Sequence, residues 1–271
     1  MNGHVETVLQ SEAKVAAARS VCKIFSPTKD GTLTATGFRV GSRFIMTACH
    51  VTSRFLEGHQ YAAEKFVVFN YKHESGFNEE DKFHLGKTVF SNLETDISVV
   101  ELECDSRTLP PPLRLFCSPV SDRGFHLIGH SQGNIMETNF VDKICIDNRE
   151  KAKLRNEMNE KSINYTGGRH CDCPPHDKID NPHRFLFLCR FTKGGSGAPG
   201  VVLIGNKIYV TTVLLWGYPN WYFDPTMEEK KVNWPVGDCI QQGVNLKSLQ
   251  EFMFLAYPDL SIDIFGDQPI P

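Results

Sequence analysis

No apolar stretch in this 271-residue chain approaches the roughly 18 residues needed to cross a lipid bilayer. The beginning of the sequence has no basic segment followed by an apolar run, so we expect no secretory signal peptide. The formal net charge is −3, which lacks the basic excess that general nucleic-acid or membrane-surface binding requires. These absences predict an intracellular protein, cytoplasmic or nuclear, without membrane contact or direct nucleic-acid binding.

Disulfide bonds are not indicated either. The nine cysteines are an odd number, so at least one cannot pair within the chain. Several lie in apolar, strand-like runs, where a free thiol behaves as a small hydrophobic side chain (Cys22, Cys117, Cys145 and Cys189). The pattern favours a reducing compartment.

What the sequence does contain is a succession of short strand-like runs separated by turn residues. A hairpin is predicted around Gly41, and a second one joins residues 201–204 to 208–216 across Gly205-Asn206. Few helical patterns intervene, which predicts an all-β fold rather than alternating strands and helices.

Three regions depart from this pattern. Residues 1–20 read as a helical lead or arm, and residues 244–253 have the 3.6-residue apolar spacing of a closing helix. Residues 146–183 are first charged and then rich in Gly, Pro, Cys and His, so we interpret them as a long insertion loop. We therefore expect a main domain over 21–255 and a tail over 256–271.

The strongest chemical signal is the run GGSGAPG at 194–200. A nucleophilic serine needs backbone N–H groups aimed at a developing oxyanion, and a turn poor in side chains permits that close approach. Such runs are also common in plain loops, so Ser196 needs partners before it indicates chemistry.

Two earlier segments offer those partners. The apolar run FIMTA over 44–48 delivers His50 just past its end, and Asp96 opens the apolar run ISVV over 97–100. Taken singly, each is more often a structural or turn residue. Together, an aspartate can fix the imidazole tautomer that leaves the other ring nitrogen free to act as a base.

The order His50, Asp96, Ser196 and the spacings of 46 and 100 residues resemble those of the chymotrypsin/trypsin-like serine proteases. The blocks TACH (47–50), DISVV (96–100) and GSGAP (195–199) are similar to that family's three signature blocks, and the likeness covers most of 21–255. Within the family, the segments TGFRVG (36–41) and IGH (128–130) and the stretch from Ser196 to the closing helix most resemble intracellular nuclear proteases associated with replication forks.

The resemblance implies two six-stranded antiparallel Greek-key β-barrels, over about 21–108 and 115–255, and a serine endopeptidase that works through an acyl-enzyme. It implies His50, Asp96 and Ser196 as the catalytic triad and an oxyanion hole formed by Gly194, Gly195 and Ser196. It also implies that the substrate backbone pairs with the strand that contains Leu215, Trp216 and Gly217. Two basic residues are expected near the pocket that binds the side chain preceding the cleaved bond: Arg190 at its floor, if it points inward, and Lys193 at its rim.

The sequence also departs from the family. Secreted members have an aspartate before the serine, which pairs with a freed N-terminal amine, whereas Gly195 stands here and no Ile-Val-Gly-Gly start exists. Val51 replaces the cysteine that follows the histidine in those members. We therefore expect no activation by an amine–carboxylate pair and no disulfide beside the site.

Three alternatives remain at the level of sequence. Ser131 lies in G-x-S-x-G, the nucleophile elbow of α/β-hydrolases, although strand-like residues follow it. The cluster His170, Cys171, Cys173 and His176 has zinc-ligand residue types but poor spacing. The third alternative is a pseudoprotease that only binds proteins. On the main interpretation we expect no cofactor and a protein or peptide substrate, including this chain itself; a homodimer is compatible with the sequence.

Overall fold

The computed structural model describes residues 7–28, 31–57, 64–73, 76–103, 108–121, 123–167, 181–223, 232–235 and 239–271. The zinc candidates His170, Cys171, Cys173 and His176 lie outside these residues. Within them, no helix is long and apolar enough to cross a membrane, and the six described cysteines are all free.

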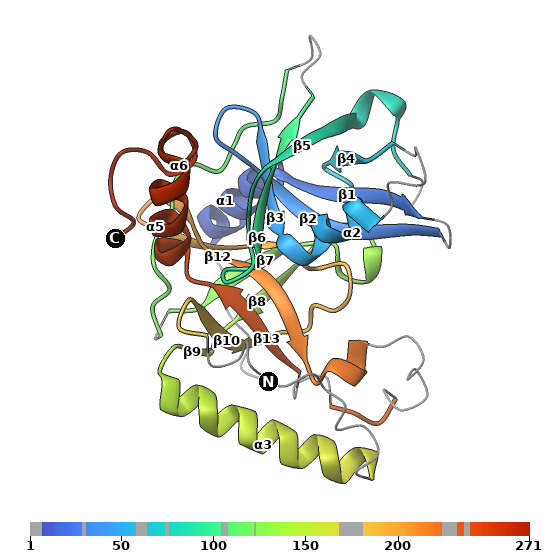
Figure 1. Cartoon of the computed structure of the whole chain (residues 1–271), viewed down its shortest axis with the longest axis vertical. Coiled ribbons are helices and arrows are strands. Elements are labelled where there is room, and N and C mark those ends of the chain that lie inside the picture. The colour runs from blue at the N-terminus through green and yellow to red at the C-terminus, as the bar shows by residue number, and fades with distance from the viewer. Residues whose placement is uncertain are drawn as a thin grey trace.

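A closed antiparallel barrel forms the first half of the molecule (Figure 1). Its strand order is β1-β2-β3-β6-β5-β4. The bounds are β1 Val21–Thr28, β2 Gly31–Val40, β3 Phe44–Ala48, β4 Phe66–Phe69, β5 Lys82–Asn92 and β6 Ile97–Leu102. Helix α2 (Cys49–Glu57) follows β3 directly, and the 3₁₀ helix η2 (Glu79–Asp81) precedes β5.

A seven-stranded antiparallel sheet forms the second half, in the order β8-β7-β11-β12-β13-β10-β9. Its strands are β7 Phe125–Gly129, β8 Glu137–Val141, β9 Ile144–Cys145, β10 Arg184–Leu188, β11 Pro199–Ile204, β12 Lys207–Tyr218 and β13 Ile240–Val244, with the 3₁₀ helices η3 (Ser131–Gly133) and η4 (Asn220–Phe223). The all-β, double-barrel fold is confirmed, but the second sheet has seven strands rather than six. The extra edge strand is the two-residue β9, which lies within the strand-like residues that follow Ser131 in the sequence.

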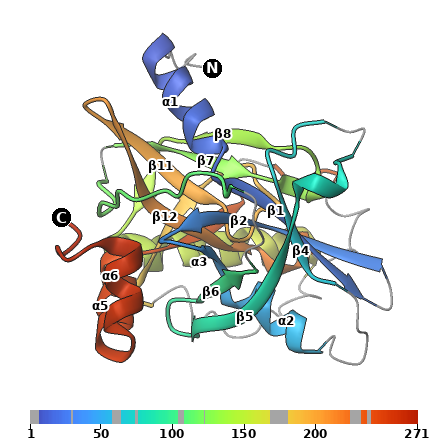
Figure 2. The same ribbon diagram turned by 90° about the horizontal axis from the view of Figure 1, so that it is seen from above.

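Both terminal segments of the chain contain helices (Figure 2). Helix α1 (Val8–Ala18) protrudes from the body of the molecule, and α5 (Leu246–Ala256) packs beside α6 (Pro258–Phe265). The predicted closing helix is therefore confirmed as α5. The expected tail contains one more helix, α6, which buries Ile264 and Phe265.

The prediction that 146–183 is an irregular loop is wrong over half its length, because α3 occupies Asn148–Thr166. The Asp147 side chain caps the helix by accepting hydrogen bonds from the N–H groups of Arg149 and Glu150, and Gly167 ends it in the left-handed conformation (φ 67°). The charged side chains that suggested a loop lie on a helix whose sequence is rich in helix-favouring Lys, Glu and Arg. Figure 1 shows α3 beyond the second sheet, away from the first barrel.

Candidate active site

Strand register in the first barrel brings His50 and Asp96 together. Strands β3 and β6 are antiparallel, and their pairing ends with Ala48 opposite Ile97. The residues just after β3 and just before β6 are therefore neighbours. The N–H of Cys49 donates to the carbonyl of Asp96 at 2.8 Å, which extends the ladder by one step.

The two side chains form a hydrogen-bonded ion-pair geometry. His50 Nδ1 lies 2.9 Å from Asp96 Oδ2, and the His50 backbone N–H donates to Asp96 Oδ1 at 3.0 Å. Because an ionised carboxylate only accepts, Nδ1 carries the proton and Nε2 is left as the basic nitrogen. This is the arrangement that a general base requires.

Asp96 is almost completely buried, with 3% of its surface exposed. Burial by itself raises the pKa of this carboxyl, but the hydrogen bond and charge of His50 and the charge of Arg184 outweigh it. The net result is a pKa below the ordinary value, so Asp96 is ionised at neutral pH.

Ser196 comes from the second half of the molecule, in the turn between β10 and β11. Two glycines of this turn have backbone conformations that L side chains rarely adopt, Gly194 (φ 96°) and Gly197 (φ 91°). A Cβ at Gly197 would lie 2.0 Å from the carbonyl oxygen of Thr36, and one at Gly194 would lie 2.7 Å from that of His130. The glycines are thus required by close backbone approach.

The same turn leaves two N–H groups free for an oxyanion. The Gly195 N–H donates to the Thr192 carbonyl at 3.0 Å, and the Gly197 N–H donates to Leu214 at 2.8 Å. Among the described residues, no acceptor binds the N–H of Gly194 or of Ser196. The oxyanion donors predicted at these two residues are available, whereas the N–H of Gly195 is already hydrogen-bonded within the turn.

Apolar packing occupies the position at which the secreted proteases have their aspartate. A Cβ at Gly195 would lie 3.0 Å from Phe191 and 3.1 Å from Leu214, both of which are buried. A carboxylate there would be desolvated without a partner. The turn is therefore ordered by packing and backbone hydrogen bonds, without an ion pair.

Thr36 on β2 connects the first barrel to this turn, a role that was not predicted from the sequence. Its N–H donates to the Ser196 carbonyl at 3.0 Å, and its hydroxyl donates to the Gly194 carbonyl at 3.0 Å. The same hydroxyl accepts the His130 N–H at 3.0 Å. Thr36 is fully buried, so these bonds are shielded from water.

The serine hydroxyl points toward β12 in this structure. Ser196 Oγ donates to the Leu215 carbonyl at 3.1 Å, and the described residues contain no hydrogen bond between it and His50. The Trp216 ring packs on His50, with ring centroids 4.1 Å apart. Rotation of the Ser196 side chain toward His50 Nε2 is the movement that would complete the triad.

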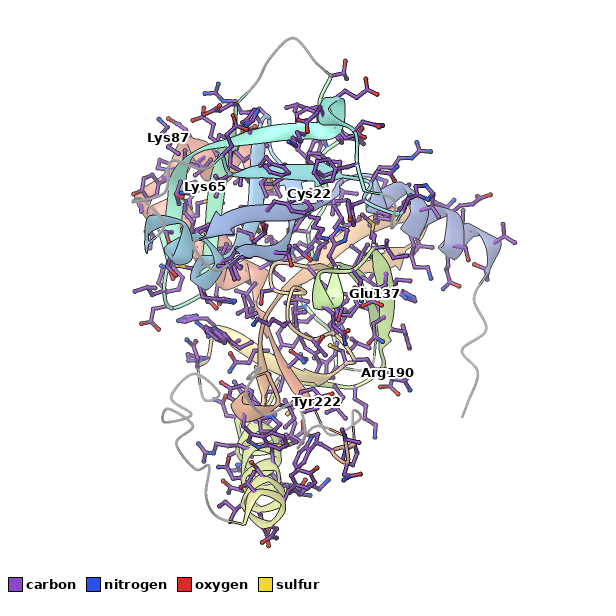
Figure 3. All side chains as sticks on the ribbon, turned by 90° about the vertical axis from the view of Figure 1, so that its right-hand side faces the viewer. Cys22, Lys65, Lys87, Glu137, Arg190 and Tyr222 are labelled. Carbon is purple, nitrogen blue, oxygen red and sulfur yellow. The ribbon has the colours of Figure 1, made fainter. Side chains whose placement is uncertain are left out.

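The substrate-binding candidates separate into two groups. Leu215, Trp216 and Gly217 lie on β12 beside the serine, where the pairing of β12 with β13 is interrupted between Leu214 and Gly217. Lys193 is exposed next to the turn. The backbone N–H of Arg190 donates to the side chain of Asn139 on β8. Because Arg190 is exposed, its side chain does not form a buried pocket floor. Figure 3 shows Arg190 at the periphery of the second sheet, on the same side as Glu137.

The α/β-hydrolase alternative is wrong, because every strand pair among the named strands is antiparallel. Ser131 lies in η3 and is buried, with its Oγ accepting the Thr192 N–H at 2.9 Å. Through this hydrogen bond, Ser131 helps to hold the backbone that leads into the Ser196 turn. The described residues contain no group of three or more potential metal ligands.

No protein-family model matches the sequence, and no curated protein matches it. Solved structures do. A thermostable serine protease, AL20, from an extremophilic microorganism has a TM-score of 0.55 and 15% identity, over 85% of this chain and 92% of its own. The Rv3671c protease of M. tuberculosis in its active form has a TM-score of 0.54 and 13% identity, over 100% and 96% of the two chains. An inactive form of Rv3671c has a TM-score of 0.52 and 12% identity, over 92% and 95%. At these identities the likeness concerns the fold, and the chain has the double-barrel fold of trypsin-like serine proteases.

Proposed function

We propose that this protein is a serine endopeptidase in which Ser196 is the nucleophile and His50 the general base, while Asp96 orients the imidazole of His50 and stabilises its protonated form. The observation that carries the proposal is the His50–Asp96 contact of 2.9 Å beside a glycine turn whose Gly194 and Ser196 N–H groups are free. The proposal is supported by the two halves of this arrangement, the His50–Asp96 pair of the first barrel and the Ser196 turn of the second sheet, which Thr36 connects.

In this mechanism, Ser196 Oγ attacks the scissile carbonyl carbon while its proton passes to His50 Nε2. The carbonyl oxygen becomes an oxyanion that accepts hydrogen bonds from Gly194 and Ser196. His50 then protonates the leaving amine, and the acyl-enzyme remains. Water repeats the attack with His50 as base, so the net reaction consumes one water and releases an acid and an amine.

Substrate binding would use the β12 backbone next to the serine. The interruption between Leu214 and Gly217 leaves Leu215 and Trp216 outside the ladder with β13. An extended peptide can pair with such a segment, and backbone pairing is indifferent to side-chain identity. Trp216, which lies over His50, would have to make room for the bound peptide.

We further propose that the enzyme works inside the cell, cytoplasmic or nuclear, because the Gly195 turn is ordered without a freed N-terminal amine. The packing of Phe191 and Leu214 around Gly195 supports this. Membership in the replication-fork-associated nuclear proteases stays a prediction from sequence resemblance.

The direct test is hydrolysis of unstructured peptides by wild type and Ser196→Ala. We expect the substitution to lower turnover by roughly 10⁶-fold, the loss seen when a triad member is removed. Ser11→Ala, on the exposed side of α1, is the matched control and should keep full activity. Equal turnover in wild type and Ser196→Ala would refute the proposal, whereas a folded wild type without any turnover would favour the binding-only alternative.

A further inference from the structure

A buried arginine from the second sheet lies behind the catalytic aspartate. Arg184 begins β10 and is 2% exposed, the largest fully buried side chain among the described residues. Its Nε and Nη2 donate to the Glu94 carbonyl at 3.0 and 2.8 Å, and Nη2 also donates to the Leu93 carbonyl at 3.0 Å. Its Nη1 donates to Gln242 Oε1 at 3.2 Å.

Every one of these acceptors is neutral. A guanidinium is charged under all ordinary conditions, and burying it without a negative partner carries a large desolvation cost. Burial lowers the pKa of Arg184, and the charge of Asp96 is the strongest of the influences that raise it again. The other titratable groups that face it are Tyr218, Glu94 and Cys49. Asp96 is therefore its main counter-charge, although the two are not in direct contact.

The Asp96 carboxylate is the buried negative charge on the other side of this pair. Within the described residues its carboxylate receives hydrogen bonds from His50 alone, one from the backbone and one from the ring. Burial opposes ionisation of this carboxyl, and the charge of Arg184 adds to the hydrogen bonds and charge of His50 in favouring the ionised form.

Arg184 also holds the backbone that presents Asp96. Glu94 and Leu93, whose carbonyls it binds, belong to the turn before β6, and Asp96 itself has a left-handed backbone conformation (φ 54°). The carbonyl of Arg184 accepts a hydrogen bond from the buried Lys151 of α3 at 3.1 Å. Arg184 thus links three parts of the molecule: its carbonyl binds α3, its backbone belongs to the second sheet, and its side chain holds the turn that contains Asp96.

We propose that Arg184 is a positioning residue of the active site: through the carbonyls of Leu93 and Glu94 it fixes the turn that presents Asp96, and it places a buried positive charge behind that turn. The inference rests on the proposed function for its catalytic meaning, but the charge coupling between Arg184 and Asp96 is a property of the fold.

The coupling is measured by a double-mutant cycle of thermal unfolding at pH 7 with Arg184→Met, Asp96→Asn and the double variant. Removing the guanidinium from wild type takes away the buried positive charge that acts on Asp96, so we expect the melting temperature to fall by roughly 5 °C or more. In the Asp96→Asn background the same change should cost less than half as much, because no buried anion is stranded. Equal losses in the two backgrounds would overturn the proposal.

Arg39 provides a matched control. It is also buried and donates to backbone carbonyls, those of Pro110, Val40 and Ser42. Arg39→Met should lower the melting temperature equally in the wild-type and Asp96→Asn backgrounds. If Arg184→Met does not fold, Arg184→Gln, which removes the charge but keeps an amide donor for the backbone carbonyls, replaces it. The cycle should show the same coupling to Asp96→Asn, and equal losses in the two backgrounds would again overturn the proposal.

The catalytic role is read from the pH profile of peptide hydrolysis. The mechanism needs ionised Asp96, and the charge of Arg184 favours that state, so Arg184→Met should move the acid limb of kcat/KM to higher pH. Arg184→Lys should leave the limb in place, and so should Arg39→Met. A purely structural role would lower the rate without moving the limb, which would also overturn the proposal. If wild type hydrolyses nothing, the proposed function fails, and the unfolding cycle still decides the coupling.

Discussion

The half of the site that comes from the first barrel contains buried charges, whereas the half from the second sheet is built almost entirely of neutral backbone. Asp96 and His50 lie 2.9 Å apart, and Arg184 reaches across to compensate the aspartate. The Ser196 turn depends instead on two glycines with positive φ and on the hydroxyl of Thr36. Substitutions that remove a charge should therefore impair hydrolysis most in the first half, and substitutions that change backbone geometry should impair it most in the second.

Apart from loss of the nucleophile Ser196 itself, the largest effect should come from removing the charge in the first half. Asp96→Asn keeps the shape of the side chain but can donate a hydrogen bond to His50 Nδ1 and so select the wrong tautomer. We expect kcat to fall by roughly 10⁴-fold with the fold intact. Hydrolysis assays together with circular dichroism check this; a loss below about tenfold would contradict the role given to Asp96.

The matching experiment on the second half is steric. Gly197→Ala would place a Cβ 2.0 Å from the Thr36 carbonyl and force a left-handed conformation on alanine. We expect hydrolysis to fall by roughly 100-fold and stability by about 3 kcal/mol. Gly205→Ala, at a hairpin turn with positive φ (60°) and nothing within 4 Å, should cost only about 1 kcal/mol and leave activity intact.

A smaller effect should follow when the two halves are uncoupled. Thr36→Val keeps the side-chain shape but leaves the Gly194 carbonyl and the His130 N–H without their buried partner. We expect turnover to fall by about tenfold and stability by about 2 kcal/mol. Thr36→Ser should restore most of both, and an unchanged rate in Thr36→Val would show that backbone contacts alone hold the turn.

The smallest effect is a pH dependence located behind the Ser196 turn. Burial lowers the pKa of His130 from 6.5 to about 4, against the bond from its Nδ1 to Asn134 and with the added influence of Lys23. Among the described residues, its Nε2 has no hydrogen-bond partner. The unfolded chain binds this proton near pH 6.5 and the folded one only near pH 4, so stability falls as pH falls through that window.

Urea unfolding should show about 2 kcal/mol of this loss between pH 7 and pH 5. His130→Gln should remove that part of the pH dependence. An unchanged difference between pH 7 and pH 5 in the variant would show that His130 is protonated as readily in the folded protein as in the unfolded chain.

The sequence predicted the parts of the fold that short motifs encode. Strand alternation and turn residues located the β2–β3 and β11–β12 hairpins, and the spacing of His50, Asp96 and Ser196 pointed to a double-barrel fold. The structure confirms that fold, and it brings the His50–Asp96 pair together through the register of β3 and β6.

The parts that escaped prediction have two causes. Helix α3 was missed although its signals are local, since Asp147 caps its beginning and Gly167 its end; only the burial of Lys151 and Met158 depends on packing. The other misses depend on contacts between distant segments. Arg184 looks like an ordinary charge at the start of an apolar strand, and only the folded chain shows that it faces Asp96. Arg190, chosen by counting back from Ser196, proved to be at the surface.

Covalent labelling with a fluorophosphonate tests the central claim most directly, with intact mass and peptide mapping on wild type and Ser196→Ala. This probe reacts with a serine only when a base and an oxyanion site activate it. The account predicts a single adduct at Ser196 in wild type and none in Ser196→Ala. An adduct at another serine, or the same labelling in both proteins, would contradict it.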